Sequence, residues 1–317
     1  MDDSDDGLRL TFNSSLFLLC CLLFCSLLLC LYLPPLLPAA PQPPDSPSAA
    51  SPSTPPGSNA GLVKISGCSI SRAGYLDYLS EVFYQRTGIR VLLKGGGSAV
   101  GLLNLASSAA DLAASCLPPQ ADDVPQGVRM VPVAWDAIVF IVHSENPLRS
   151  ITLEQARAIF SGQISNWSRL GGPDRPLTLF LQKAPRSGLQ QGVAYFIKHT
   201  LLDGEDITDD PTIVSTRPSG GLVEEALLRS PEGVAATGFT SARLKRDRLR
   251  ILAVDGAEAT RENIISGAYP AKLRRHLYLA LRPDSPPAAQ RFLNFVLSPE
   301  GQKLLRDHGA VALDELR

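Results

Sequence analysis

The sequence has few of the residues that build metal and redox centres. Four histidines are scattered along the 317 residues, and the six cysteines include no C-x-x-C pair. A zinc or iron–sulfur site is therefore not expected, and the sequence suggests no cofactor. The formal net charge is −1, which does not suggest a nucleic-acid-binding surface, because such a surface usually carries a concentrated basic patch.

Patterns typical of enzymes are also missing. We find no Ser-His-Asp arrangement and no acidic pair at a spacing that suggests hydrolysis. The glycine-rich segment 95–101 does not fit the nucleotide-binding pattern G-x-G-x-x-G, because Val100 stands where the third glycine belongs. We therefore expect a protein that is not an enzyme.

The N-terminal segment is apolar and carries almost no charge. Residues 16–33 form a run of 18 residues in which Ser26 is the only strongly polar one, a length at the lower limit for crossing a bilayer. An acidic start and the lack of an A-x-A-like exit favour an uncleaved signal anchor over a cleaved signal peptide. Because no Lys or Arg follows the run until Lys64, we expect the C-terminal side to lie outside the cytoplasm.

This organisation predicts a single-pass protein of the cell membrane with an extracytoplasmic domain, periplasmic or at the cell surface. Residues 1–33 would form the acidic N-terminus and the transmembrane helix. Residues 34–61 are rich in Pro, Ser and Ala, a composition that stays extended and does not form a core. We interpret that segment as a semi-stiff linker to the folded part.

The folded part begins with alternating strand and helix patterns. The β-α-β-α-β succession comprises strands at 62–67, 89–94 and 111–115 and helices at 76–88 and 98–105. Such a succession predicts a parallel sheet with helices on its faces. Residues 131–142 form a longer apolar segment, which we interpret as a strand that crosses between two lobes.

Helix-capping patterns mark several boundaries. Thr152 and Gln155 form a capping box, and Ser298 precedes Pro299 at the favoured first position of a helix. Ser98, after the glycine turn, is expected to be an N-cap.

Several segments together resemble a known family. The segments are residues 151–155, 159–162, 166–167 and 292–302. In combination they are similar to the phosphate-binding proteins of bacterial ABC importers, within the wider family of two-lobed periplasmic solute-binding proteins. The resemblance implies an α/β periplasmic-binding-protein (Venus-flytrap) fold. Each lobe would be a mainly parallel sheet flanked by helices, with the ligand between the lobes.

The resemblance also implies lobe boundaries and a function. Residues 62–133 and 269–317 would form the first lobe, and residues 134–268 the second. The protein would capture inorganic phosphate or a related oxyanion in the inter-lobe cleft and deliver it to the permease of an ABC importer. The alternative is an oxyanion sensor or adaptor module with a degenerate or altered pocket, whose partner would be a sensor protein.

The family holds its oxyanion with loops at helix N-termini, where free N–H groups and the helix dipole favour an anion. The residues that this implies here are Ser69, Ser71, Gly97, Ser98, Ser115, Cys116, Lys183, Arg186, Ser187 and Gly188. The sequence departs from the family where Lys183 replaces an arginine and Leu189 a threonine. Cys116 stands where relatives place a carboxylate or a hydroxyl. Cys68 and Cys116 follow neighbouring strands, and either a disulfide or two free thiols fits that placement.

Overall fold

The computed structural model describes residues 61–183 and 191–316. These residues fall within one compact unit, Pro55–Arg317. The predicted anchor and linker lie outside the described residues, as do Arg186, Ser187 and Gly188 of the predicted site. Within the described ranges, no helix has both the length and the apolar character needed to cross a membrane.

The first half of the fold is a parallel β-α-β-α-β unit, as the sequence predicts. Strand β1 (Leu62–Gly67) lies between β2 (Arg90–Gly95) and β3 (Leu112–Ser115), and both pairings are parallel. The helical segments between them are α2 (Ser69–Ser71), the π-helix η1 (Arg72–Leu76), α3 (Asp77–Thr87) and α4 (Ser98–Ala106). The carboxyl ends of β1 and β3 therefore lie side by side.

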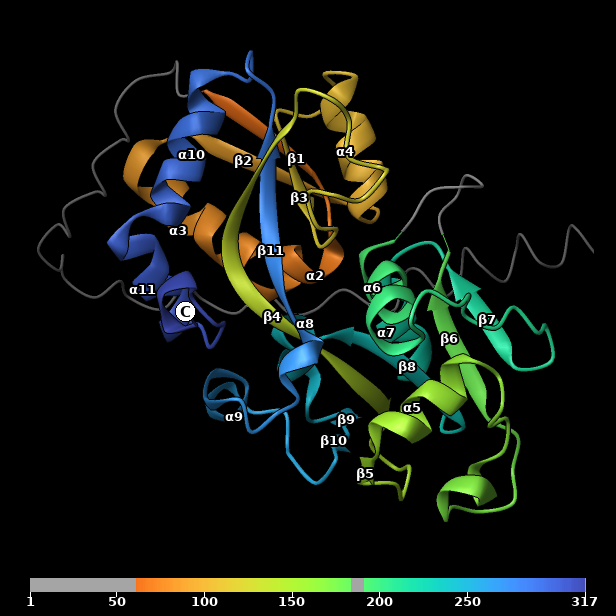
Figure 1. Cartoon of the computed structure of the whole chain (residues 1–317). Helices are drawn as coiled ribbons and strands as arrows, with labels where there is room; N and C mark the ends of the chain where they lie inside the picture. The colour runs from red at the N-terminus through yellow and green to blue at the C-terminus, as the bar shows by residue number, and fades with distance from the viewer. Residues whose placement is uncertain (1–60, 184–190, 317) are drawn as a thin grey trace, which may run out of the picture. The chain divides into compact units, whose positions relative to one another are not determined.

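One long strand joins the two halves of the molecule. Strand β4 (Arg129–His143) pairs with β11 (Arg274–Leu281) through its first part and with β8 (Gly233–Gly238) from Ile138 onward. The prediction of a crossing strand at 131–142 is confirmed. Figure 1 shows β4 and β11 running together from one half into the other.

The second half is built on parallel strands β6 (Thr178–Gln182), β7 (Val214–Arg217) and β8, with β6 in the middle. The short strand β9 (Leu249–Ile251) pairs antiparallel with β4, and β5 (Ser150–Ile151) pairs with β10 (Ala253–Val254). The helices of this half are α5 (Leu153–Phe160), α6 (Gly192–Phe196), α7 (Gly220–Leu227), α8 (Phe239–Ala242) and α9 (Arg261–Ser266). The remaining short segments are η2 (Trp167–Leu170), η3 (Ile197–Leu201), η4 (Arg243–Lys245) and η5 (Ala271–Leu273).

One continuous sheet, in the order β2-β1-β3-β11-β4-β8-β6-β7, is mixed in both halves, where a mainly parallel sheet in each lobe was predicted. The antiparallel pairs all involve β4 or β11, namely β3 with β11, β4 with β11, β4 with β8 and β4 with β9. The physical reason is that the crossing strands pass between the lobes and complete a sheet on each side. The outer three strands of each half remain parallel, namely β2, β1 and β3 in the first and β8, β6 and β7 in the second.

Two hydrophobic cores correspond to two lobes. Val133 and Ala134 of β4 belong to the core under α3 and α10 (Pro287–Leu297), whereas residues 137–142 belong to the core of the second half. In the first core, the ring of Phe292 meets Phe83 edge-on with centroids 5.2 Å apart. The mixed α/β, two-lobed fold is thus established, and each lobe has its own interior.

Two of the predicted helix caps, at α5 and at α11 (Pro299–Asp307), are present. The Thr152 hydroxyl accepts from the backbone of Gln155, and the Gln155 side chain accepts from the backbone of Thr152. Ser298 caps α11 by accepting from Gly301 N–H at 3.1 Å. A last short helix, η6 (Leu313–Glu315), follows.

Candidate ligand-binding cleft between the lobes

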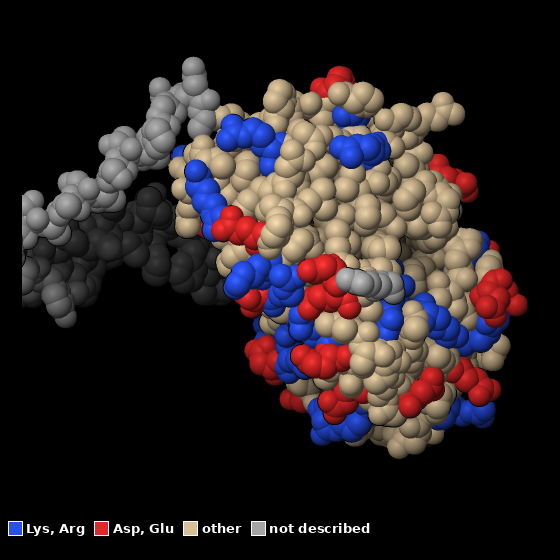
Figure 2. Space-filling model, turned by 60° about the vertical axis from the view of Figure 1, so that its left-hand side comes forward, with Lys and Arg blue, Asp and Glu red and all other residues tan. Residues whose placement is uncertain are grey.

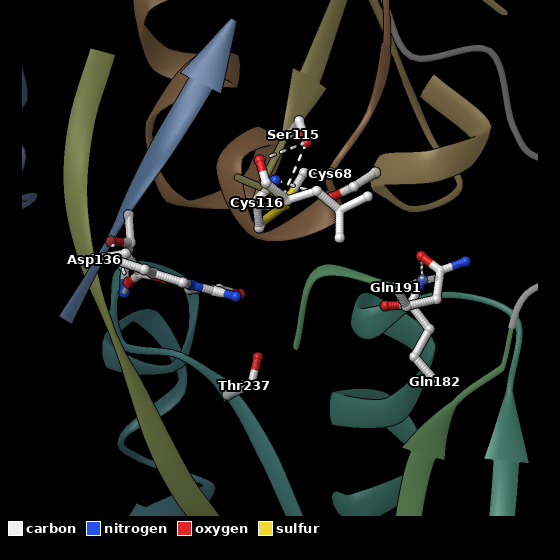
Figure 3. The surroundings of a disulfide bond; sticks show 12 residues. Cys68, Ser115, Cys116, Asp136, Gln182, Gln191 and Thr237 are labelled. Atoms are coloured by element: carbon white, nitrogen blue, oxygen red, sulfur yellow. Dashed lines mark hydrogen bonds and ion pairs between the residues drawn. A yellow bond between two sulfur atoms is a disulfide. The ribbon is translucent and has the colours of Figure 1, made fainter. Parts of the chain in front are cut away.

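A disulfide joins the carboxyl ends of β1 and β3. It links Cys68 to Cys116 across a Cα–Cα distance of 6.4 Å, and both residues are buried. The backbone N–H of Cys68 donates to Ala114 O at 2.8 Å, which fixes the loop after β1 against β3. Of the two alternatives for these cysteines, the structure therefore has the disulfide, which Figure 3 shows among its neighbours.

Ser98 lies at the start of α4 but does not cap it, so the predicted N-cap is wrong. The N-cap is Gly97, at a φ of 101°, and Ser98 is the first helical residue. Its Oγ accepts a hydrogen bond from the backbone N–H of Cys116 at 2.9 Å. Because a hydroxyl that accepts one bond still has a proton to donate, Ser98 keeps a donor although only 2% of it is exposed.

The other predicted serines have different surroundings. The Ser115 hydroxyl takes part in the turn after β3, accepting from Leu117 N–H at 3.0 Å and donating to Leu117 O at 3.4 Å. Ser71 is completely buried. Ser69 lies nearer the surface, and its Oγ is 3.1 Å from the position that a Cβ on Gly95 would take. Of the three, Ser69 is the most accessible.

Lys183 directly follows β6, and its side chain is exposed. Its backbone N–H donates to Arg217 O at 2.9 Å, which holds the start of the predicted anion loop to the end of β7. The remaining predicted residues of that loop are those that lie outside the described ranges.

Residues of the second lobe lie directly against the loops of the first. A Cβ added to Gly192, in the first turn of α6, would be 2.6 Å from the Cβ of Cys116 and 3.1 Å from the Oγ of Ser98. A Cβ added to Gly97 would be 2.6 Å from Nε2 of Gln182 and closer still to Oε1 of Gln191. The structure thus brings Gly97, Ser98 and Cys116 together with the ends of the Lys183 loop.

Two glutamines at this contact were missed by the sequence reasoning. Gln182 donates from Nε2 to Oε1 of Gln191 at 2.9 Å. Gln191 is 2% exposed, and within the described part of the chain its Nε2 is buried without a hydrogen-bond partner. Figure 3 shows the two glutamines and the disulfide on opposite sides of the contact between the lobes. The available signal was a polar side chain at the carboxyl end of a strand, directly before Lys183.

A cavity of about 610 Å³ lies beside this contact, and among the predicted site residues that the structure describes only Ser69 lines it. The first lobe contributes Ser69 and Lys94 to its wall, and the second contributes Ser219, Gly221 and Glu225. The Ser219 hydroxyl caps α7, accepting from Leu222 N–H at 3.3 Å. The opening is therefore lined by both lobes. Its charged residues are Arg72, Asp77 and Lys94 from the first lobe and Glu225 and Lys245 from the second.

A buried ion pair lies where β4 and β11 cross. Arg275 donates to Asp136 Oδ2 from Nη2 at 2.9 Å and from Nε at 3.2 Å. The other carboxylate oxygen of Asp136 accepts from both the N–H and the hydroxyl of Thr240, at 2.9 Å and 2.8 Å. This network ties the crossing strands to α8.

Two buried phenols lie near the same carboxylate. Burial raises the pKa of Tyr75 and of Tyr269 well above the ordinary value of 10.0, and the negative charge of Asp136 adds to the effect. Tyr269 donates its hydroxyl to Ile138 O at 2.9 Å. Both phenols therefore stay protonated, and they add no charge to the crossing region.

Metal ligation has no support in the geometry. Over the described ranges, no three side chains of His, Cys, Asp or Glu gather closely enough to hold an ion. The donors that the cleft offers are instead hydroxyl, amide and backbone N–H groups, which suit an oxyanion.

Comparisons with known proteins agree with this architecture. The phosphate-binding protein PstS of Bacillus subtilis is 24% identical over 261 residues, which covers 81% of this chain and 83% of that protein. PstS of Borreliella burgdorferi is 25% identical over 228 residues, covering 71% and 80%. A similar fold is found in a solved structure from Clostridium perfringens, that of a putative phosphate ABC transporter substrate-binding protein with bound phosphate. The two structures superpose with a TM-score of 0.68 at 21% sequence identity. The superposition covers 80% of this chain and 100% of that one. The profile of the PBP superfamily domain matches residues 52–300, and the chain belongs to that superfamily.

Proposed function

We propose that this protein captures phosphate or a related oxyanion between its lobes and that it binds its ligand without catalysing a reaction. One observation carries the proposal: Ser98, at the first turn of α4, is in reach of both Cys116 of its own lobe and Gly192 of the other. The start of α4, the end of β3 and the start of α6 therefore meet at one place. The named function of the relatives in Bacillus and Borreliella supports phosphate as the ligand.

The chemistry of that place fits a tetrahedral oxyanion. The first N–H groups of a helix have no intrahelical acceptor and carry partial positive charge, and α4 begins at Ser98. The Ser98 hydroxyl and the buried Nε2 of Gln191 add neutral donors. Lys183 would bring the positive charge, as a single flexible ammonium and not as a fork of two parallel donors.

The same donor set predicts weak discrimination among oxyanions. A carboxylate in contact with the ligand would accept a hydrogen bond from protonated phosphate and repel a fully ionised sulfate. Here the Cys116 sulfur is bonded to Cys68, so that position offers no charged acceptor. We therefore expect sulfate to compete with phosphate.

We further propose how the binding unit is placed and used. Residues 62–133 with 269–317 would form one lobe and residues 134–268 the other. Residues 16–33 would anchor the chain in the cell membrane with the lobes outside the cytoplasm. The lobes would close on the anion by a hinge motion, and the permease of an ABC importer would recognise the closed form.

Isothermal titration of the full-length protein with phosphate, and separately with sulfate, tests the proposal. We expect phosphate to bind with micromolar affinity or tighter, and to bind at least about tenfold more weakly in Lys183→Ala and in Ser98→Ala, since each removes one charged or hydroxyl donor. Lys272→Ala is the matched control, because Lys272 is an exposed lysine in η5.

No heat with either anion would contradict phosphate capture. The departures at Lys183 and Cys116 would then be explained by the alternative, a sensor or adaptor module with an altered pocket. If Lys183→Ala and Lys272→Ala lost the same affinity for phosphate, the affinity would depend on the overall charge of the protein and not on Lys183 in this cleft.

A further inference from the structure

A second pocket, lined by arginines, lies in the second lobe at the carboxyl end of β4. Its volume is about 360 Å³, and it shares none of the residues that line the cleft cavity. Its wall includes Ser144, Arg149, Arg246, Leu249, Arg250 and Glu258. Basic and acidic side chains are interspersed over the lower part of the face in Figure 2. The lining of this pocket has three arginines and one carboxylate.

Two of the three guanidinium groups are held in place by neutral partners. Arg246 donates from Nη2 to Ala259 O at 2.5 Å, and its Cζ lies 5.8 Å from the ring centroid of Phe239. Arg250, in β9, donates from Nη2 to the carbonyl oxygen of Ser144. Neither contact neutralises a positive charge, so the contacts orient the two arginines and leave their charge available.

The guanidinium groups of this pocket have few hydrogen-bond partners among the described residues. Within residues 61–183 and 191–316, Nε of Arg250 is buried without a hydrogen-bond partner. No ion pair joins Arg149, Arg246 or Arg250 to a carboxylate among those residues. Each guanidinium has five N–H donors in a planar fork that matches carboxylate and phosphate oxygens. Glu258 offsets one charge, and the pocket keeps an excess of two positive charges.

The buried side chains of Leu249 and Ala259 form an apolar part of the wall. A pocket with an apolar part and a few oriented charged groups is typical of small-molecule sites. The volume exceeds what a single tetrahedral oxyanion needs. It therefore suits a ligand with two or more anionic groups that several arginines can contact at once.

We propose that this pocket, lined by Arg149, Arg246 and Arg250, is a second binding site, which takes a small polyanion that carries at least two phosphoryl or carboxylate groups. The site is separate from the cleft, and its ligand differs from the single oxyanion proposed there. Binding would weaken with added salt, because the contacts are between charges near the surface.

Titration of the full-length protein with pyrophosphate, in saturating phosphate, tests the second site. We expect pyrophosphate binding that is at least about tenfold weaker in Arg149→Ala, and tighter in Glu258→Gln because one repelling charge is removed. Arg149 is exposed, so its replacement is not expected to disturb folding. Arg248→Ala is the matched control: Arg248 is also exposed and close in sequence, but it does not line the pocket.

The cleft variant Ser98→Ala separates this proposal from the first. The second site would be overturned if the affinity for pyrophosphate fell in Ser98→Ala and not in Arg149→Ala. It would also be overturned if Arg149→Ala and Arg248→Ala lost the same affinity. An absence of heat with pyrophosphate would contradict it as well. Citrate in place of pyrophosphate distinguishes the ligand class. Whichever of pyrophosphate and citrate binds more tightly, its binding supports the second site only if Arg149→Ala weakens it.

Discussion

Asp136 and Arg275 face each other across β4 and β11 and form an ion pair that is almost completely removed from water. The side chains are 0% and 4% exposed, and the two residues are direct partners in the strand register. Since β4 and β11 are the strands that pass between the lobes, this pair stabilises the region about which the lobes would move.

Replacing one member of the pair should strongly destabilise the protein. We expect Asp136→Asn to lower the free energy of unfolding by about 3–5 kcal/mol, because Arg275 is left with a buried charge that has no counter-ion. Denaturant titration followed by circular dichroism measures the change. The same substitution at Asp307, whose partner Lys303 is exposed, should cost less than about 0.5 kcal/mol. Similar losses at the two positions would contradict the role of the buried pair.

Gly97→Ala should keep the lobes from closing fully. A methyl group would be strained at its φ of 101° and would have to push aside the amide ends of Gln182 and Gln191. We expect phosphate affinity to fall roughly tenfold or more, since closure would have to displace both glutamines. Gly127→Ala is the control, because Gly127 also has a positive φ of 76° but nothing within 4 Å of an added Cβ. A comparable loss of affinity in both variants would attribute the effect to backbone strain alone.

Removal of the disulfide should affect both stability and binding. The bond closes a loop with a sequence separation of 48, and we expect the variant with Cys68→Ser and Cys116→Ser to lose about 2–4 kcal/mol of stability. Phosphate affinity should also fall, because Cys116 N–H orients the Ser98 hydroxyl. Thermal unfolding and titration measure the two effects.

A reducing agent provides the control for that variant. Dithiothreitol should lower the melting temperature of the natural protein and leave the double serine variant unchanged. If dithiothreitol shifted the melting temperature of both proteins by a similar amount, the shift would come from the other cysteines of the chain and not from the Cys68–Cys116 bond.

The His276 side chain should make one region of the fold sensitive to acid. Its ring lies 3.6 Å from that of Trp135, centroid to centroid, and partial burial lowers its pKa below 6.5. The neutral form is therefore favoured in the folded state. Its contribution to stability is complete above pH 6.5 and is lost as the pH falls below that value toward the lower pKa of the folded state.

Tryptophan fluorescence checks this pH dependence. We expect a transition below pH 6.5 when His276 becomes charged beside the Trp135 ring, and we expect His276→Gln to remove it. The other tryptophan of the chain, Trp167, is buried with its Nε1 donating to Glu232 O at 3.1 Å. A transition that persists in His276→Gln would assign the signal to another group.

Local patterns in the sequence predicted local structure well. The capping box of Thr152 and Gln155, the strand at β1 and the end of α3 at Gly88 all depend on residues within a few positions of one another. Such signals act through backbone geometry and neighbouring hydrogen bonds, which a short stretch of sequence determines.

Contacts between distant residues could not be predicted in the same way. Asp136 and Arg275 are 139 positions apart, and Ser98 and Cys116 are 18 apart. Ser98 was expected to bond within its own helix turn, but its hydroxyl instead accepts from the loop after β3. Gln182 and Gln191 were missed because their contact with Gly97 depends on how the two lobes meet.

The place of β11 in the sheet has a consequence for synthesis of the protein. The first lobe needs β11, α10 and α11 to cover β3 and β1, and these elements are the last to be made. The parallel strands β6, β7 and β8 of the second lobe follow one another in the middle of the chain. Since the lobes are proposed to lie outside the cytoplasm, where the disulfide can form, we expect the second lobe to fold there before the first is complete. The Cys68–Cys116 bond would hold the ends of β1 and β3 together until the C-terminal strand arrives.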